Sequence, residues 1–193
     1  MKARTCIPAA LAALASLLLA SFARASEFPA ETIVDGQRLV LNGSATRTVW
    51  GFGIYHIGLF LTEKSGDEQA ILANDQEPKR IHIRMVREVG KQRFTGTVQQ
   101  SLDQNFSPED TRRFASEIAR FLAFFHQGEG LKQGTEITID FIPARGMVAA
   151  KDGVELGVIP GADFYHKILG LWIGKPLQKS IKDGLLGRGA GWW

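Results

Sequence analysis

Cysteine is almost absent from this sequence, since Cys6 is the only one among 193 residues. A single thiol cannot form a disulfide within the chain, so packing must stabilise the fold even in an oxidising compartment. The sequence also contains no glycine-rich phosphate loop, no G-x-S-x-G elbow and no H-E-x-x-H motif. Nothing positive supports a Ser-His-Asp triad, which is recognised by geometry. We therefore expect no catalytic residue and no cofactor.

Clustered histidines are missing as well. The four histidines are scattered along the chain without metal-ligand spacing: His56, His82, His126 and His166. A metal site needs several such side chains to converge with carboxylates. We therefore expect no metal site.

Long apolar runs are rare, and the one present covers residues 7–22 after Lys2 and Arg4. It is shorter than the roughly 18–20 residues that cross a bilayer. Ala23-Arg24-Ala25 then offers the small residues that a signal peptidase accepts. We expect residues 1–25 to be a cleaved signal peptide that directs export, with the periplasm as destination and no membrane insertion afterwards. An uncleaved membrane anchor or a buried helix is the alternative.

Excess charge of one sign is also lacking once the signal is removed. The formal charge of +3 comes from the three basic residues of that segment. Residues 26–193 contain 20 basic and 20 acidic residues. Overall charge therefore gives no support to nucleic acid or an anionic membrane surface as a partner. Protein partners cannot be inferred from this composition.

The patterns that are present indicate one α+β domain over residues 26–187, followed by a flexible tail over 188–193. Asp35-Gly36 and Lys151-Asp152-Gly153 predict hairpin turns, and Asn42-Gly43-Ser44 predicts a turn or a bulge. Strand-like segments come first and last, at 32–34, 39–41, 46–61, 81–85, 137–141, 147–150 and 154–158. Helical segments lie at 67–73, 91–105, 107–125, 160–172 and 177–185. This order predicts a largely antiparallel sheet with helices packed on one face and a cleft beneath them.

Alternation is strictest over residues 80–85, where Ile81, Ile83 and Met85 share one face. His82 alternates with two arginines, which predicts a solvated face for it. The segment 46–61 is interrupted by Gly51 and Gly53, which indicate a bulge or a bend.

Arg47 lies between the glycine-containing turn and an aromatic strand. A guanidinium in an apolar setting is costly unless it pairs with an anion, and it can bind a carboxylate through two hydrogen bonds. The alternatives are an arginine in water, or one paired with Glu31 or Asp35. Eight residues of straight strand would hold Arg47 and Tyr55 roughly 26 Å apart. They converge only if the strand bends.

Several segments together resemble the chalcone isomerase-like family, and its exported bacterial branch most closely. The resemblance covers about residues 30–187. Its segments are Leu41-Asn42-Gly43-Ser44-Ala45-Thr46-Arg47, Tyr55-His56-Ile57-Gly58-Leu59-Phe60-Leu61, Gly90-Lys91-Gln92-Arg93-Phe94, the strand 134–141, Lys151-Asp152-Gly153, Ile159-Pro160-Gly161, Leu171-Trp172-Ile173-Gly174 and Leu185-Leu186-Gly187. It implies an open-faced β-sandwich with a ligand cleft between the sheet and the helices.

The resemblance also implies a site. Arg47 matches the substrate-steering arginine of the plant enzymes, but their polar network is replaced by Tyr55, Phe94, Ser101 and Leu171. An arginine followed by a tyrosine resembles the fatty-acid-binding members, in which this pair grips a carboxylate. We therefore expect a non-catalytic binder of a fatty acid or similar apolar carboxylate. The expected ligand-binding residues are Arg47, Tyr55, Phe94, Val98, Ser101, Leu171 and Trp172. The alternatives are an isomerase acting on a conjugated ketone, and a scaffold protein without a ligand.

Overall fold

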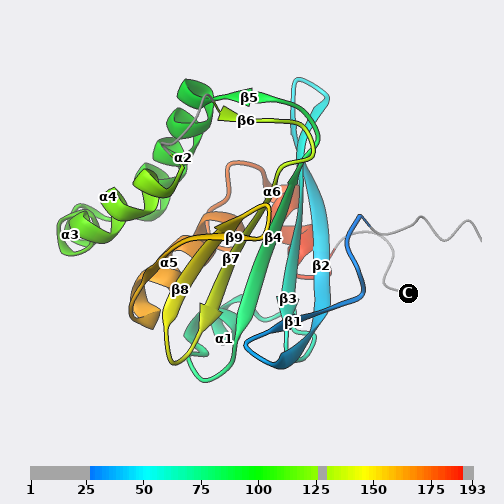
Figure 1. Cartoon of the computed structure of the whole chain (residues 1–193), viewed down its shortest axis with the longest axis vertical. Coiled ribbons are helices and arrows are strands. Elements are labelled where there is room, and N and C mark those ends of the chain that lie inside the picture. The colour runs from blue at the N-terminus through cyan, green and yellow to red at the C-terminus, as the bar shows by residue number, and fades with distance from the viewer. Residues whose placement is uncertain (1–26, 126–129, 189–193) are drawn as a thin grey trace, which may run out of the picture.

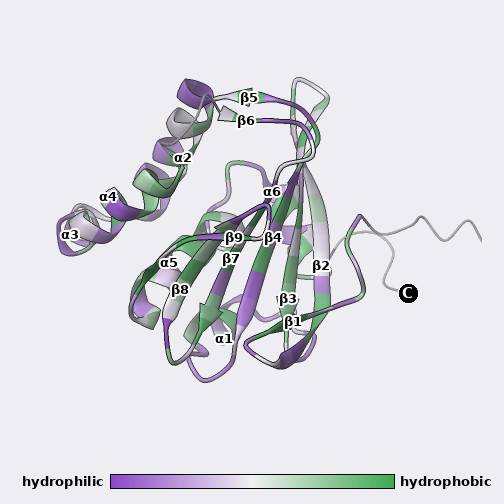
Figure 2. Cartoon of the chain, viewed as in Figure 1, coloured by the Kyte–Doolittle hydropathy of each residue, from purple (hydrophilic) through white to green (hydrophobic). Residues whose placement is uncertain are grey.

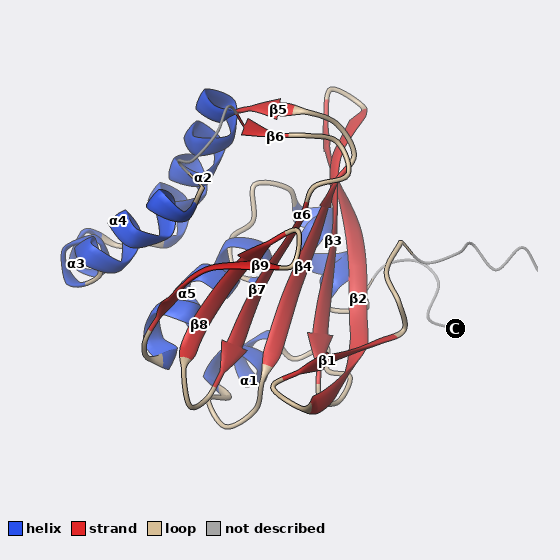
Figure 3. Cartoon of the chain, in the orientation of Figure 1, coloured by secondary structure: helices blue, strands red, loops and turns tan. Residues whose placement is uncertain are grey.

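A curled, seven-stranded antiparallel sheet forms the centre of the computed structural model (Figures 1 and 3). The structure describes residues 27–125 and 130–188, so the predicted signal peptide, His126 and residues 189–193 of the predicted tail lie outside it. The strands, in spatial order, are β1 Glu31–Val34, β2 Gln37–Val49, β3 Phe52–Leu61, β4 Lys79–Met85, β7 Glu136–Ile142, β8 Gly146–Lys151 and β9 Val154–Ile159. The predicted α+β class with an antiparallel sheet is confirmed.

Between β4 and β7 the chain leaves the sheet and makes a helical excursion (Figure 1). A two-stranded ribbon begins and ends this excursion, formed by β5 Val89–Gly90 and β6 Gly130–Leu131. It carries the helices α2 Lys91–Asn105, α3 Pro108–Arg113 and α4 Ala115–Phe124. The predicted helix over 107–125 is thus divided at Phe114, after a capping box between Ser107 and Asp110 starts it as its sequence indicates.

The remaining helices lie behind the sheet in Figure 3, and every described helix except α3 contributes a buried residue to the core on the same face. They are α1 Glu68–Ala73, α5 Ala162–Ile173 and α6 Lys179–Leu185. Helix α5 is the central one, since seven of its residues are buried. Helices α2, α3 and α4 are anchored far less, because Leu102 and Phe121 are their only buried residues. None of the described helices is both long and apolar enough to span a membrane.

The predicted β-type stretch over residues 46–61 is interrupted where Gly51 and Gly53 indicated, but the interruption is a hairpin turn that divides the stretch into β2 and β3. Trp50 and Gly51 have φ angles of 55° and 80° and form a two-residue turn, after which Phe52 pairs with Val49. Tryptophan rarely adopts a positive φ, so the sequence gives no usual turn signal here. The hairpin makes Arg47 and Tyr55 direct cross-strand partners and removes the separation of a straight strand.

A bulge in β2 decides which face Arg47 occupies. Leu41 pairs with Phe60 on the outer face, but the register shifts at Asn42, so that Gly43 pairs with Leu59 on the helix-covered face. Residues after the bulge therefore keep the odd numbering of Leu41 yet point to the opposite side. The predicted turn or bulge at this position is a bulge, and it directs Arg47 toward the helices.

The outer face of the sheet is only partly in water, which corrects the prediction for His82. The segment before β1 places Phe28 over this face, and the ring of Phe28 lies 5.0 Å from that of His82. Phe28 and Phe60 belong to a small second core there. Figure 2 shows how hydrophobic and hydrophilic residues alternate along the strands.

Candidate ligand-binding site

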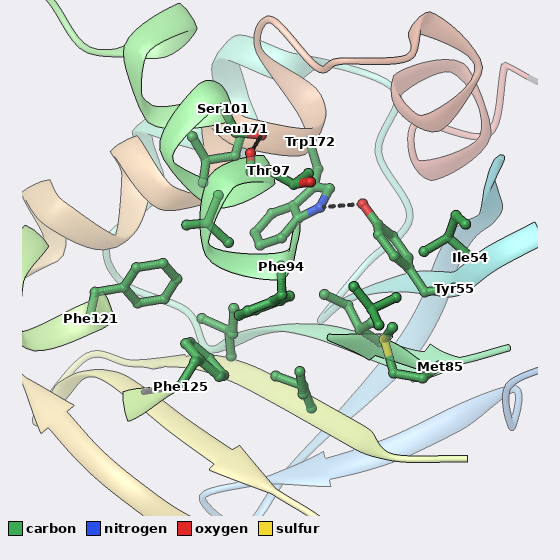
Figure 4. A pocket seen from close by; sticks show the side chains of 15 residues that line it. Ile54, Tyr55, Met85, Phe94, Thr97, Ser101, Phe121, Phe125, Leu171 and Trp172 are labelled. Atoms are coloured by element: carbon green, nitrogen blue, oxygen red, sulfur yellow. Dashed lines mark hydrogen bonds between the residues drawn. The ribbon is translucent and has the colours of Figure 1, made fainter. Parts of the chain in front are cut away.

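An apolar cavity of about 100 Å³ lies between the sheet, α2, α4 and α5 (Figure 4). Its lining is almost entirely hydrocarbon and aromatic. The residues are Ile54, Tyr55, Ile83, Met85, Val89, Phe94, Thr97, Val98, Ser101, Phe121, Phe125, Ile137, Ile139, Leu171 and Trp172. This is the position under the helices where the fold class predicts a cleft.

The floor of the cavity comes from strands and its roof from helices, which differ in side-chain periodicity. Alternate residues of β4 and β7 form the floor, with Ile83 and Ile139 among them. The roof contains a chain of aromatic rings: the ring of Phe125 lies 5.4 Å from Phe94 and 5.5 Å from Phe121. Edge-to-face contacts of this kind fix the rings while leaving an apolar surface toward the cavity.

One end of the cavity is polar, and Tyr55 and Trp172 mark it (Figure 4). The indole Nε1 of Trp172 donates a hydrogen bond of 3.4 Å to the hydroxyl of Tyr55. Burial raises the pKa of Tyr55 above its usual value of 10.0. The phenol is therefore protonated at neutral pH, and its own proton is available to a ligand oxygen.

Arg47 lies beyond this pair, in a second cavity of about 30 Å³. The two cavities share Tyr55, Trp172 and three further lining residues: Thr97, Ser101 and Leu171. The small cavity is therefore a polar extension of the apolar one, and the hydrogen-bonded pair Tyr55–Trp172 lines both.

Among the described residues, the guanidinium of Arg47 hydrogen-bonds to a neutral side chain only. Its Nη1 donates a hydrogen bond of 3.0 Å to Oε1 of Gln178, which also accepts from the backbone N–H of Thr48. Across residues 27–125 and 130–188, Arg47 forms no ion pair, and Glu31 is instead paired with Arg38. The alternative of a fully solvated arginine also fails, because the side chain is half-buried against α5 and the segment before α6.

The hydroxyls on α2 are committed to their own helix. Thr97 donates to the carbonyl of Arg93 at 2.9 Å, and Ser101 donates to that of Thr97 at 3.1 Å. Each can still accept a hydrogen bond but has no free proton to donate. Among the described residues that line the larger cavity, Tyr55 is the only titratable one.

The structure brings the seven expected site residues together. Six of them line the apolar cavity, and Arg47 lines its polar extension. Sequence reasoning missed Gln178 and the floor residues Ile83, Ile137 and Ile139. The alternation in 81–85 and 137–141 was a usable signal for the floor, whereas nothing in the sequence marks Gln178. Within the described part of the chain, no three His, Cys, Asp or Glu side chains gather as a metal site.

The chain is similar to a known protein family and to a solved structure. A family model described as chalcone isomerase-like matches residues 21–187. Among solved structures, the chain is similar to the crystal structure of a fatty-acid binding protein of Arabidopsis thaliana. The TM-score is 0.59 at 18% sequence identity, covering 82% of this chain and 90% of that one. At this identity the likeness concerns the fold. No curated protein matches the chain in a sequence search.

Proposed function

The chain belongs to the chalcone isomerase-like family, and on that premise we propose that it is a non-catalytic binder of a fatty acid or similar apolar carboxylate. The carboxylate would bind in the polar extension, between Arg47 and the hydroxyl of Tyr55. The hydrocarbon chain would lie in the apolar cavity. The name of the Arabidopsis protein with the same fold is consistent with this use of the cleft.

The observation that carries this proposal is a half-buried guanidinium at the polar end of an apolar cavity, with no anionic partner in the part of the chain that the structure describes. Taking a charge from water costs free energy unless a partner compensates it, and the amide of Gln178 does so only in part. A carboxylate can accept two hydrogen bonds from the guanidinium and a third from Tyr55. Such a head group with an apolar tail matches both ends of the site.

A bound chain would need more space than the cavity now provides. Its volume of about 100 Å³ is below the roughly 300–1,000 Å³ of typical ligand pockets. The side of the cavity formed by α2 and α4 is the one we expect to yield, because those helices bury only Leu102 and Phe121 within their length, against seven residues in α5, although Phe106 and Phe125 at their ends are also buried. Segments with few buried apolar contacts move at low free-energy cost. We therefore expect α2 to shift outward when a ligand enters.

The polar residues that line the cavity give less support to isomerase chemistry. A general acid or base needs a pKa near the working pH, whereas burial moves that of Tyr55 further away from neutrality. Thr97 and Ser101 already donate to the backbone of α2, so they would be poor groups for polarising a ketone. The site therefore suits holding a ligand better than transforming it.

The place where the ligand would be bound follows from the first residues. The basic start, the apolar run and Ala23-Arg24-Ala25 predict export, and the proposal accordingly places the protein in the periplasm. A fatty acid there needs a carrier, because its apolar tail is poorly soluble in water.

Paired ligands test the proposal, with dodecanoate and dodecanol differing only in the head group. Isothermal titration should show that the wild-type protein binds dodecanoate more tightly than dodecanol. Arg47→Ala should weaken dodecanoate binding by about tenfold or more, since a hydrogen bond to a charged group contributes roughly 1.5–3 kcal/mol. Binding of dodecanol should change little. Native mass spectrometry of protein purified from cells should show retained fatty acid in the wild type and less in the variant.

Arg38→Ala is the matched control, because Arg38 lies on the same strand but is exposed and paired with Glu31. It should leave both affinities unchanged. Equal affinity of the wild type for acid and alcohol, or equal retention of lipid by Arg47→Ala, would refute the proposed head-group site.

A further inference from the structure

The three two-residue hairpin turns of the sheet share one backbone conformation but not one sequence. Asp35-Gly36 and Asp152-Gly153 have φ angles of 49° and 76°, and of 50° and 79°. Trp50-Gly51 has 55° and 80°. Both positions of such a turn require a positive φ, for which Asp-Gly and Asn-Gly are the favoured pairs. A bulky aromatic residue in this conformation is an outlier.

Packing within the protein does not offset this backbone strain, because the side chain of Trp50 is almost fully exposed. Its exposed fraction is 93%, and Phe52, the first residue after the turn, is 58% exposed. Val49 on the other side of the turn is 37% exposed. The apolar tip of the hairpin, defined here as Val49, Trp50 and Phe52, thus projects into solvent. A strained, exposed tryptophan indicates an interaction outside the described chain.

One cation contacts this apolar tip, and two more follow it in the sequence. The guanidinium of Arg87 lies 5.0 Å from the ring centre of Phe52. The first turn of α2 carries Lys91 and Arg93 and no acidic residue, although the positive end of the helix dipole favours acids there. Figure 1 shows β5 and the β2–β3 hairpin at the same end of the molecule, with α2 beginning at the end of β5 that points away from the hairpin. Residues 87–93 contain these three basic residues and one acidic residue, Glu88, for a net charge of +2, whereas residues 26–193 hold equal numbers of basic and acidic residues.

We propose that the apolar tip inserts into the interfacial region of an anionic lipid bilayer, with Arg87, Lys91 and Arg93 contacting the lipid phosphates. Tryptophan is enriched at this depth because its ring is apolar while its N–H can still reach water. Each basic residue close to an anionic surface adds attraction. Three apolar side chains form too small a patch for a stable protein interface, which buries roughly 1,200–2,000 Å².

The apolar tip lies close to the polar end of the cavity, so membrane docking would bring the proposed ligand-binding site near the lipids. Arg47 lies three residues before Trp50 and Tyr55 four residues after Gly51, roughly 10–13 Å along the strands. Interfacial segments enter a bilayer to a depth of about 5–10 Å. Insertion of the tip would therefore bring the polar end of the cavity to the level of the lipid head groups. The docking itself needs no ligand in the cavity, so it can fail or succeed independently of the proposed function.

Vesicle binding tests this proposal directly. The full mature chain is sedimented with vesicles of phosphatidylglycerol and phosphatidylcholine, and with vesicles of phosphatidylcholine alone. The wild type should bind the anionic vesicles, and brominated lipids should quench tryptophan fluorescence more in the wild type than in Trp50→Asp, because the chain has three other tryptophans. Trp50→Asp creates the same turn as the other two hairpins, so its melting temperature should not fall, while vesicle affinity drops at least tenfold. Arg87→Gln should weaken binding about fivefold.

Phe52→Ala and Val154→Ala form a matched pair, because each residue directly follows a two-residue turn and is exposed, Val154 to 67%. Only Phe52→Ala should weaken vesicle binding. No binding by the wild type, equal binding to neutral vesicles, or full binding by Trp50→Asp would each overturn the proposal. A concentration-dependent dimer in sedimentation velocity that Trp50→Asp abolishes would assign the tip to a second copy of the chain instead.

Discussion

Val98→Trp is expected to abolish fatty-acid binding while leaving the protein folded. Val98 lies on α2 and is one of the half-buried residues in the cavity lining. An indole at this position would occupy much of a space of about 100 Å³ and leave no room for a hydrocarbon chain. Since the helix is lightly anchored, it can accommodate the ring at a cost within the roughly 1–3 kcal/mol typical of overpacking. Affinity for dodecanoate, measured by isothermal titration, should fall at least a hundredfold.

Gln99→Trp provides the control for this experiment. Gln99 is the next residue of the same helix but is exposed, so the same side chain is added outside the cavity. Its affinity for dodecanoate should match that of the wild type. Binding retained by Val98→Trp would show that the ligand lies elsewhere, even if Arg47→Ala weakens it.

Gly43→Ala should be the most destabilising conservative substitution in the hairpin. A Cβ at this position would lie 2.1 Å from the carbonyl oxygen of Gly184 and 2.8 Å from that of Leu185. Both contacts are with backbone of α6 or its end, which cannot rotate away as a side chain can. The buried side chain of Asn42 adds hydrogen bonds to the carbonyls of Ser65 and Leu185, and these fix the same junction. We expect a loss of at least about 3 kcal/mol in the free energy of unfolding, measured with urea.

Gly53→Ala is the matched control on the partner strand. Its Cβ would lie 3.6 Å from side-chain atoms of Thr46 and Val86, which is ordinary contact. The change should stay within about 1 kcal/mol. A Gly43→Ala variant as stable as Gly53→Ala would mean that α6 does not pack against β2 as described. The bulge would then no longer explain how Arg47 reaches the cavity.

Elements with a strong local pattern could be predicted from the sequence. The strand around Ile81, Ile83 and Met85 has strict alternation, and its burial follows that alternation residue by residue. Helix α3 begins where Ser107-Pro108 indicates, because the capping box is a local arrangement. In these cases the signal and the structure depend on the same few residues.

The β2–β3 hairpin could not be predicted because its turn departs from local preference. Trp50 occupies a position where aspartate or asparagine is the usual signal, so Gly51 and Gly53 indicated a bulge or a bend rather than a hairpin. The side of the sheet that Arg47 faces was equally hidden. It depends on a one-residue bulge at Asn42, whose stability comes from Ser65 and Leu185, far away in the sequence.

The candidate site was accessible mainly through the family resemblance. Arg47, Tyr55 and the apolar residues of α2 and α5 could be assigned by position within motifs. The missing ion pair of Arg47 and its hydrogen bond to Gln178 depend on tertiary contacts between residues 131 positions apart. These contacts carry the functional argument, and only the folded structure provides them.

The proposed function depends most on an apolar chain lying under α2 with its carboxylate at Arg47. A crystal structure with bound 12-bromododecanoic acid tests this directly, because the anomalous signal of bromine locates the end of the chain. We expect the bromine near Phe121 and Phe125 and the carboxylate within hydrogen-bond distance of Arg47 and Tyr55. A bromine outside the cavity, or a carboxylate away from Arg47, would contradict the account.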